Sequence, residues 1–156
     1  MTSTQIILVA VVIQASALAA TSQTARCIES SRLALKTDTR VKPSHIVGRF
    51  TRSKVTGIAI RVVEANVDRA AILFCLDASR SSKSFAIFED ERIGFSATWR
   101  KIGPREARGL KLDFDDYPVS RGDVLGMFWE GAGVAVLFWN GARIEYRILT
   151  LRTAGK

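Results

Sequence analysis

The stretch Tyr117–Thr150 constrains the fold most, because it consists of strand-like apolar runs joined by tight turns. Asp123–Glu130 and Val134–Trp139 flank a Gly-Ala-Gly turn, and Asn140-Gly141 leads into Arg143–Leu151. Asn-Gly between apolar runs favours a type I′ hairpin, in which both central residues need positive φ. The last run alternates with the period of two that is typical of a half-buried strand. We therefore predict an antiparallel meander here.

The preceding chain, from Arg26 onwards, predicts further short strands separated by turns. Val55–Val63 is rich in β-branched residues, and the wholly apolar Ala70–Leu76 indicates a central strand buried on both faces. No segment shows a convincing helical period, and Arg100–Gly109 is predicted to be a loop that holds Pro104. About ten short strands at near-regular spacing indicate an all-β fold, a two-sheet antiparallel β-sandwich of the jelly-roll type.

The N-terminal residues are typical of a cleaved secretory signal. Ile6–Ala20 carries no charge and is too short to span a bilayer, and Ala17-Leu18-Ala19 supplies the small residues of a cleavage site. The alternative is a buried N-terminal strand or helix. We expect a signal peptide over residues 1–20, one β-sandwich domain over residues 26–153, and a secreted, extracellular protein.

Cys27 and Cys75 are the only cysteines. In a secreted chain such a pair most simply forms one disulfide bond. In the chain-entropy model, a bridge that closes a loop of this length stabilises the fold by about 4 kcal/mol. The alternative is two unpaired thiols, with Cys75 as a small core residue.

The chain has a formal net charge of +8 and a pI near 10.1. A basic secreted protein attracts acidic partners such as sulfated glycans, anionic lipid head groups or acidic proteins. We expect a glycan or an acidic protein surface as the partner, with no nucleic acid, no stable membrane insertion and no cofactor. The oligomeric state stays open.

Several motifs resemble those of the galectins. His45–Phe50 and Ala71–Arg80 resemble galectin strands, and Tyr117–Gly122 resembles their Phe-Pro-Phe-x-x-Gly turn. Gly122–Gly126 and Leu137–Gly141 are equally similar to the SPRY pattern Gly-Asp-Val-Ile-Gly … Phe-x-x-Asn-Gly. Both families are concanavalin-like sandwiches, so the resemblance, which covers about His45 to Leu151, implies that architecture and a binding function.

The resemblance also implies where a sugar would lie. Galectins hold galactose with a His-x-Asn-Pro-Arg run, a later Asn and a Trp-x-x-Glu run. Here Cys75–Ser79 followed by Arg80 stands at the first position, Phe95 near that of the stacking Trp, and Arg100 at the basic one. Since the polar partners of galactose are replaced, we expect no retention on lactose–agarose.

The densest positive cluster is Arg100–Lys111, which directly follows Trp99. Cations beside an aromatic ring bind sulfate or carboxylate through charge-assisted contacts and stacking. The alternatives are a merely solvated loop and, for Trp99, a place in the core. We predict a non-catalytic, lectin-like module for acidic or sulfated glycans, or else a secreted SPRY-like protein–protein interaction module. The predicted contact residues are Arg80, Phe95, Trp99, Arg100, Lys101 and Arg105.

An enzyme is the least favoured interpretation. Asp113 and Asp115 lie two apart on a predicted strand, hence about 7 Å apart on one side. That spacing suits an inverting glycosidase, and the oxygens would also suit calcium. The alternative is a solvated strand end. His45 is the only histidine, so the sequence predicts neither a zinc site nor a catalytic triad.

Export is directly testable. The protein recovered from the medium of a secreting host should begin near Ala20, because the small residues before it suit signal peptidase. N-terminal sequencing and intact mass measure this. Recovery of a secreted protein that retains residues 1–20 would contradict the expectation.

Overall fold

The computed structural model describes residues 22–51, 54–67, 69–77, 84–88, 98–109, 122–129 and 133–149. The predicted signal peptide lies outside these ranges. The same holds for Arg80 and Phe95 of the predicted site, and for the catalytic candidates Asp113 and Asp115.

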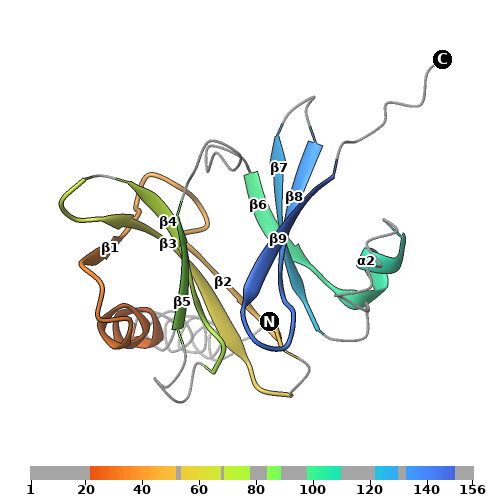
Figure 1. Ribbon diagram of the computed structural model, residues 1–156, viewed down its shortest axis with the longest axis horizontal. Coiled ribbons are helices and arrows are strands. Elements are labelled where there is room, and N and C mark those ends of the chain that lie inside the picture. Colours follow the sequence, from red (N-terminus) through yellow and green to blue (C-terminus); the bar gives the residue numbers. More distant parts are fainter. Residues whose placement is uncertain are drawn as a thin grey trace, which may run out of the picture.

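The described chain is mostly β, with two antiparallel sheets (Figure 1). The first sheet has the strand order β1-β3-β4-β5, with β2 also paired to β3, and the second has the order β6-β7-β8-β9. Residues 22–30 form an N-terminal helix, and a short helix α2 follows β6. The element bounds are β1 Leu35–Thr37, β2 His45–Gly48, β3 Gly57–Glu64, β4 Ala70–Cys75, β5 Ser84–Phe88, β6 Thr98–Ile102, α2 Pro104–Gly109, β7 Val124–Trp129, β8 Gly133–Trp139 and β9 Ile144–Leu149.

The space between the two sheets is filled by one apolar cluster. Alternate residues of β3 and β4, including Ala59, Ile72 and Phe74, meet Leu125 and Leu137 from the second sheet. The wholly apolar β4 is buried throughout, as its sequence predicts. Two antiparallel sheets that share a core in this way are consistent with a β-sandwich.

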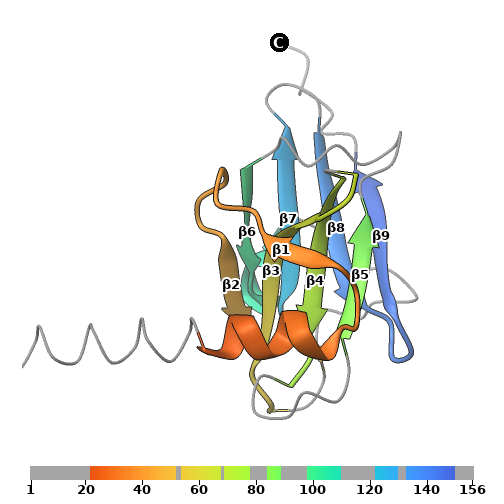
Figure 2. The same cartoon turned by 90° about the vertical axis from the view of Figure 1, so that its left-hand side faces the viewer.

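The outer face of each sheet is covered by a helix. On the first sheet, Cys27 and Ile28 of the N-terminal helix pack against the outward residues of β3 and β4 (Figure 2). On the second sheet, Ala107 of α2 packs with Val124 and Val136. The predicted short strands form from Leu35 onwards, but the expectation that the chain has no helix was wrong. Strands that are apolar on both faces need cover on both, and helices provide it.

The jelly-roll prediction is not confirmed. In a jelly roll, two Greek keys form the two sheets. In the described part of the chain, the first sheet contains β1 to β5 and the second contains β6 to β9. β1 and β2 both pair with β3, and all other neighbouring strands follow one another along the sequence. Each sheet is therefore close to a meander.

The edge of the first sheet is interrupted. β1 pairs with Glu64–Val62 of β3, and β2 pairs with the next part of the same edge, Ile60–Gly57. The intervening residue Arg61 donates its backbone N–H to Ser44 O at 2.8 Å and accepts from Asp38 N at 2.9 Å. Residues 38–44 therefore loop out of the edge, at the position where Pro43 predicts a break in the strand.

The C-terminal hairpins form as predicted but differ in detail. Trp129 pairs with Gly133, so this glycine belongs to the β7–β8 ladder and not to the turn that the sequence predicts. At the next turn Asn140 Oδ1 accepts from the backbone N–H of Ala142 and Arg143. Gly141 has φ 112°, and Asn140 is not in the left-handed region. The central pair is therefore Gly141-Ala142 and not Asn140-Gly141.

The disulfide between Cys27 and Cys75 is confirmed, with the two Cα atoms 6.0 Å apart. It ties the N-terminal helix to the end of β4 and is buried in the outer cluster of the first sheet. Such a bond indicates an oxidising environment.

The bridge should contribute measurably to stability. Replacing both cysteines by serine should lower the free energy of unfolding by up to about 4 kcal/mol, because a loop in the unfolded chain is no longer closed. Guanidinium unfolding of the variant and of the oxidised parent measures the difference. Equal midpoints for the two proteins would contradict a stabilising role.

Candidate functional site

The predicted basic loop at Arg100–Gly109 is not a loop. It consists of the end of β6, Gly103 and the helix α2. Successive side chains of a strand point to opposite faces, so Arg100 and Lys101 are directed to opposite sides of the second sheet. The expectation of one cluster held by a flexible loop was wrong, because the strand separates its first two cations.

Arg100 lies on the outer face beside α2. Its Nη2 is 2.6 Å from Glu106 Oε1, and its guanidinium carbon stacks 4.7 Å from the centroid of the Phe128 ring. Hydrogen bonding to Glu106 raises the pKa of Arg100, and the same contact lowers the pKa of Glu106. The cation is well oriented, but one acidic group already neutralises much of its charge.

Lys101 lies where β6 meets β2. Its Nζ is 3.8 Å from Oδ2 of the buried Asp123. Asp123 also joins the two sheets, because its Oδ2 accepts from Arg49 N and its own N–H donates to Arg49 O, each at 2.8 Å. A Cβ at the preceding Gly122, which has φ 141°, would collide with the Arg49 carbonyl oxygen. The Gly-Asp pair thus has a structural role at this seam.

Trp99 belongs to the core. Its side chain is 2% exposed, and its Nε1 donates to Pro43 O at 2.8 Å. This hydrogen bond attaches the loop of residues 38–44 to β6. The buried ring has little exposed surface on which a sugar could stack. Arg105 is exposed on α2.

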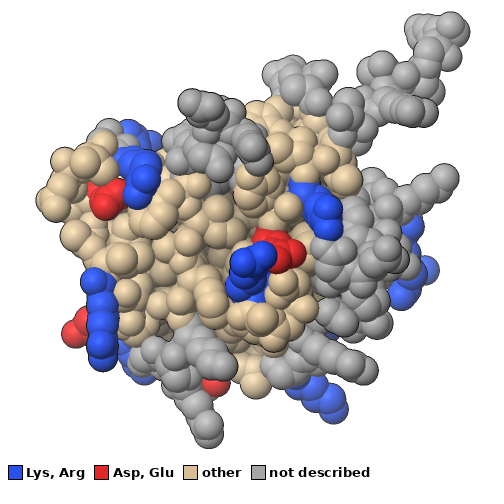
Figure 3. Space-filling model, in the orientation of Figure 1, with Lys and Arg blue, Asp and Glu red and all other residues tan. Residues whose placement is uncertain are grey.

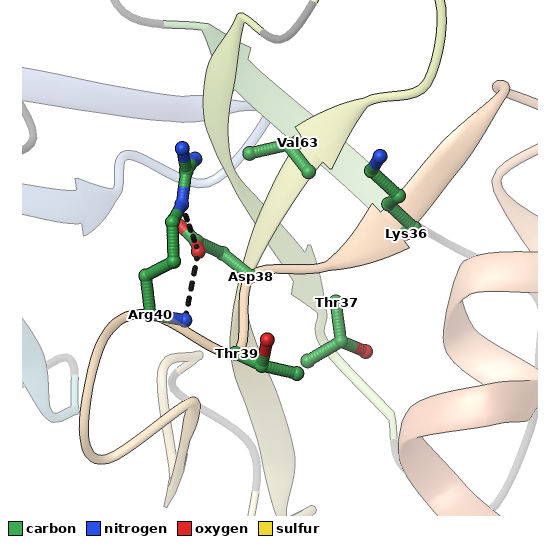
Figure 4. A pocket seen from close by; sticks show the side chains of 6 residues that line it. All are labelled: Lys36, Thr37, Asp38, Thr39, Arg40 and Val63. Atoms are coloured by element: carbon green, nitrogen blue, oxygen red, sulfur yellow. Dashed lines mark hydrogen bonds and ion pairs between the residues drawn. The ribbon is translucent and has the colours of Figure 1, made fainter.

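A different basic site lies at the β1 end of the first sheet, and we call it the β1 pocket. It has a volume of about 330 Å³, which is in the range of small-ligand sites. Figure 4 shows Lys36 and Arg40 on the two sides of Val63, with their charged ends directed to the same side. The lining residues are Lys36, Thr37, Asp38, Thr39, Arg40 and Val63.

Asp38 is a buried carboxylate that orients the Arg40 side chain in the pocket. Its side chain is 3% exposed, and its Oδ1 accepts from both the backbone N–H and the Nε of Arg40, at 3.1 and 2.9 Å. This hydrogen bonding, with the field of the buried Arg61, holds the pKa of Asp38 below its ordinary value. The carboxylate is therefore ionised at neutral pH and fixes the Arg40 side chain.

The pocket retains a positive balance. One carboxylate, Asp38, faces the cations Lys36 and Arg40, and the buried Arg61 adds to the same field. The fixed guanidinium and the separate ammonium can each bind a carboxylate or sulfate group, and threonine hydroxyls both donate and accept hydrogen bonds. Groups of these kinds can bind an anionic molecule that carries hydroxyl groups.

Sequence reasoning missed this pocket. The signal available was the alternation of Lys36, Asp38 and Arg40, which puts three charged residues at every second position. Their approach to Val63 depends on the pairing of β1 with β3. That register is a long-range property of the fold.

Other kinds of site are not found in the described ranges. No group of three or more His, Cys, Asp or Glu side chains there could hold a metal ion. In the same ranges, no helix has the length and apolar character needed to cross a membrane. Lysines and arginines on the face seen in Figure 3 stand in separate spots and do not form one broad positive field.

Compared with models of protein families, with curated proteins and with solved structures, this chain matches none of them. The resemblances to galectins and SPRY domains thus identify no family.

The electrostatics of Asp38 predict an acid-sensitive step in stability. Because its pKa is lower in the folded state, its contribution is complete above the unfolded value of about 3.9 and is lost as the pH falls below it. Asp38→Asn should cost about 1 kcal/mol at pH 7, since the exposed Arg40 is screened by water.

Urea unfolding of both proteins between pH 7 and pH 2 measures this. The difference between the parent and Asp38→Asn should shrink towards zero at the acidic end. A difference that stays constant over the whole range would show that ionisation of Asp38 does not contribute.

Proposed function

We propose that this chain is a secreted, non-catalytic binding protein for acidic or sulfated glycans, with the β1 pocket as its principal contact. The observation that carries the proposal is the arrangement of Lys36 and Arg40 on either side of Val63, with Asp38 fixing the guanidinium. A uronic carboxylate or sulfate would bind these cations, and a sugar hydroxyl would reach Thr39.

Three further features support a binding role outside the cell. The net charge of +8 favours polyanions, the disulfide suits an oxidising compartment, and the N-terminal residues are typical of a signal peptide. The resemblance to concanavalin-like sandwiches favours ligand binding over catalysis. Of the sequence-predicted contact residues, Arg100 on β6 and Arg105 on α2 remain as exposed cations of an alternative site.

Single substitutions separate the two candidate sites. Lys36→Ala should weaken binding to heparin-like chains by up to about fivefold, because an exposed ion pair contributes less than about 1 kcal/mol. Arg40→Lys keeps the charge but removes the fork that binds both Asp38 and an anion, so it should weaken binding as well. Elution salt on heparin–agarose and titration calorimetry measure both effects.

The matched control is Lys54→Ala. Lys54 is exposed and precedes Gly57, which begins β3. Because β1 pairs with the other end of β3, this substitution removes one positive charge at a distance from the pocket. If Lys54→Ala and Lys36→Ala shift the elution salt equally, only bulk charge is acting. If Arg100→Ala weakens binding while Lys36→Ala does not, the site lies at β6 and α2.

A glycan array at two salt concentrations tests the ligand class. Sulfated and uronic sugars should bind, and their signals should fall at high salt, because exposed charges are screened over about 10 Å at 0.1 M. Lactose should not bind. Absence of any glycan signal would favour the rival function, a protein–protein interaction module for acidic surfaces.

A further inference from the structure

The outer edge of β9 has no paired strand within the part of the chain that the structure describes. Among the described strands, β9 pairs only with β8. An open groove of about 400 Å³ runs along the strand and is lined by five consecutive residues, Arg143 to Arg147. In Figure 2, β9 lies at the same side of the molecule as β5, the edge strand of the other sheet.

The backbone of β9 determines which residues could pair there. Asn140 donates its backbone N–H to Arg143 O at 3.0 Å, so Asn140 and Arg143 form a hydrogen-bonded pair in the β8–β9 ladder. Such pairs alternate along antiparallel strands. Glu145 and Arg147 therefore direct their backbone groups to β8, whereas Ile144, Tyr146 and Ile148 direct theirs to the open edge.

We propose that the outer edge of β9 pairs with the same edge of a second copy of this chain. The two strands run antiparallel, and a two-fold axis passes through the pair formed by Tyr146 of each chain. In this register Tyr146 faces its own copy, and Ile144 faces Ile148 of the other chain. All three residues have outward-directed backbone groups, and each pair exchanges two hydrogen bonds. The two second sheets would then join into one continuous sheet.

Charge selects this register. With the axis at Tyr146, Glu145 of each chain faces Arg147 of the other, in the non-hydrogen-bonded pairs where side chains lie closest. Moving the axis to Glu145 or to Arg147 would put each of these residues against its own like charge. The register also pairs Ile144–Ile148 of the two chains and covers Ile148, which is 49% exposed.

Sedimentation and light scattering test the proposal, because the parent should form a dimer whose population rises with concentration. Glu145→Arg and Arg147→Glu should each weaken dimerisation by at least roughly tenfold, since each change places like charges opposite twice. The double exchange Glu145→Arg with Arg147→Glu should restore the dimer. Mixing the two single variants should give a heterodimer.

Three controls separate pairing from folding and from bulk charge. Glu29→Arg and Arg105→Glu make the same charge changes on the two helices, and both should leave the dimer intact. Arg143→Gln removes the ion pair within one chain, 2.8 Å to Glu145, but keeps the contact between chains, so it should also remain dimeric. Thermal unfolding verifies that each variant is folded.

A parent that is monomeric at all soluble concentrations would overturn the proposal. A double exchange that stays monomeric while folded would overturn the register, and with it the axis at Tyr146. Neither result depends on glycan binding, which is measured separately.

Discussion

The structure depends on one constraint, which is that its central strands are apolar on both faces. β3, β4 and β8 are buried almost throughout, so each sheet needs cover on two sides. The two sheets cover each other on the inside, and the N-terminal helix and α2 cover the outsides. The disulfide and the Asp123–Arg49 contacts then fix the order of these layers.

The strands were predictable because their pattern is local. The buried run at β4 and the presence of a tight turn after β8 follow from residue type, although the central pair of that turn is shifted by one residue. The helices were missed because they are short and have few apolar residues. The N-terminal helix packs through Cys27 and Ile28, and α2 packs through Ala107. A helix of this length has almost no period to detect, and the packing against a sheet stabilises it.

In the two candidate sites, too, local sequence predicts some features and the tertiary structure determines the others. The sequence identifies the cations of β6 and α2, but the pleat of a strand determines that Arg100 faces Glu106 and that Lys101 faces Asp123. The β1 pocket requires the pairing of Lys36 with Val63, residues 27 positions apart in the chain. Residue type can therefore suggest an anion site, but only the register of distant strands assembles one.

The interruption between β1 and β2 bears on how the protein stays soluble. A long uninterrupted edge strand exposes a row of backbone donors and acceptors on which foreign chains can grow into fibrils. Here that edge is divided into segments of three and four residues, with a proline in the loop between them. The first sheet is thereby protected from templated aggregation along this side.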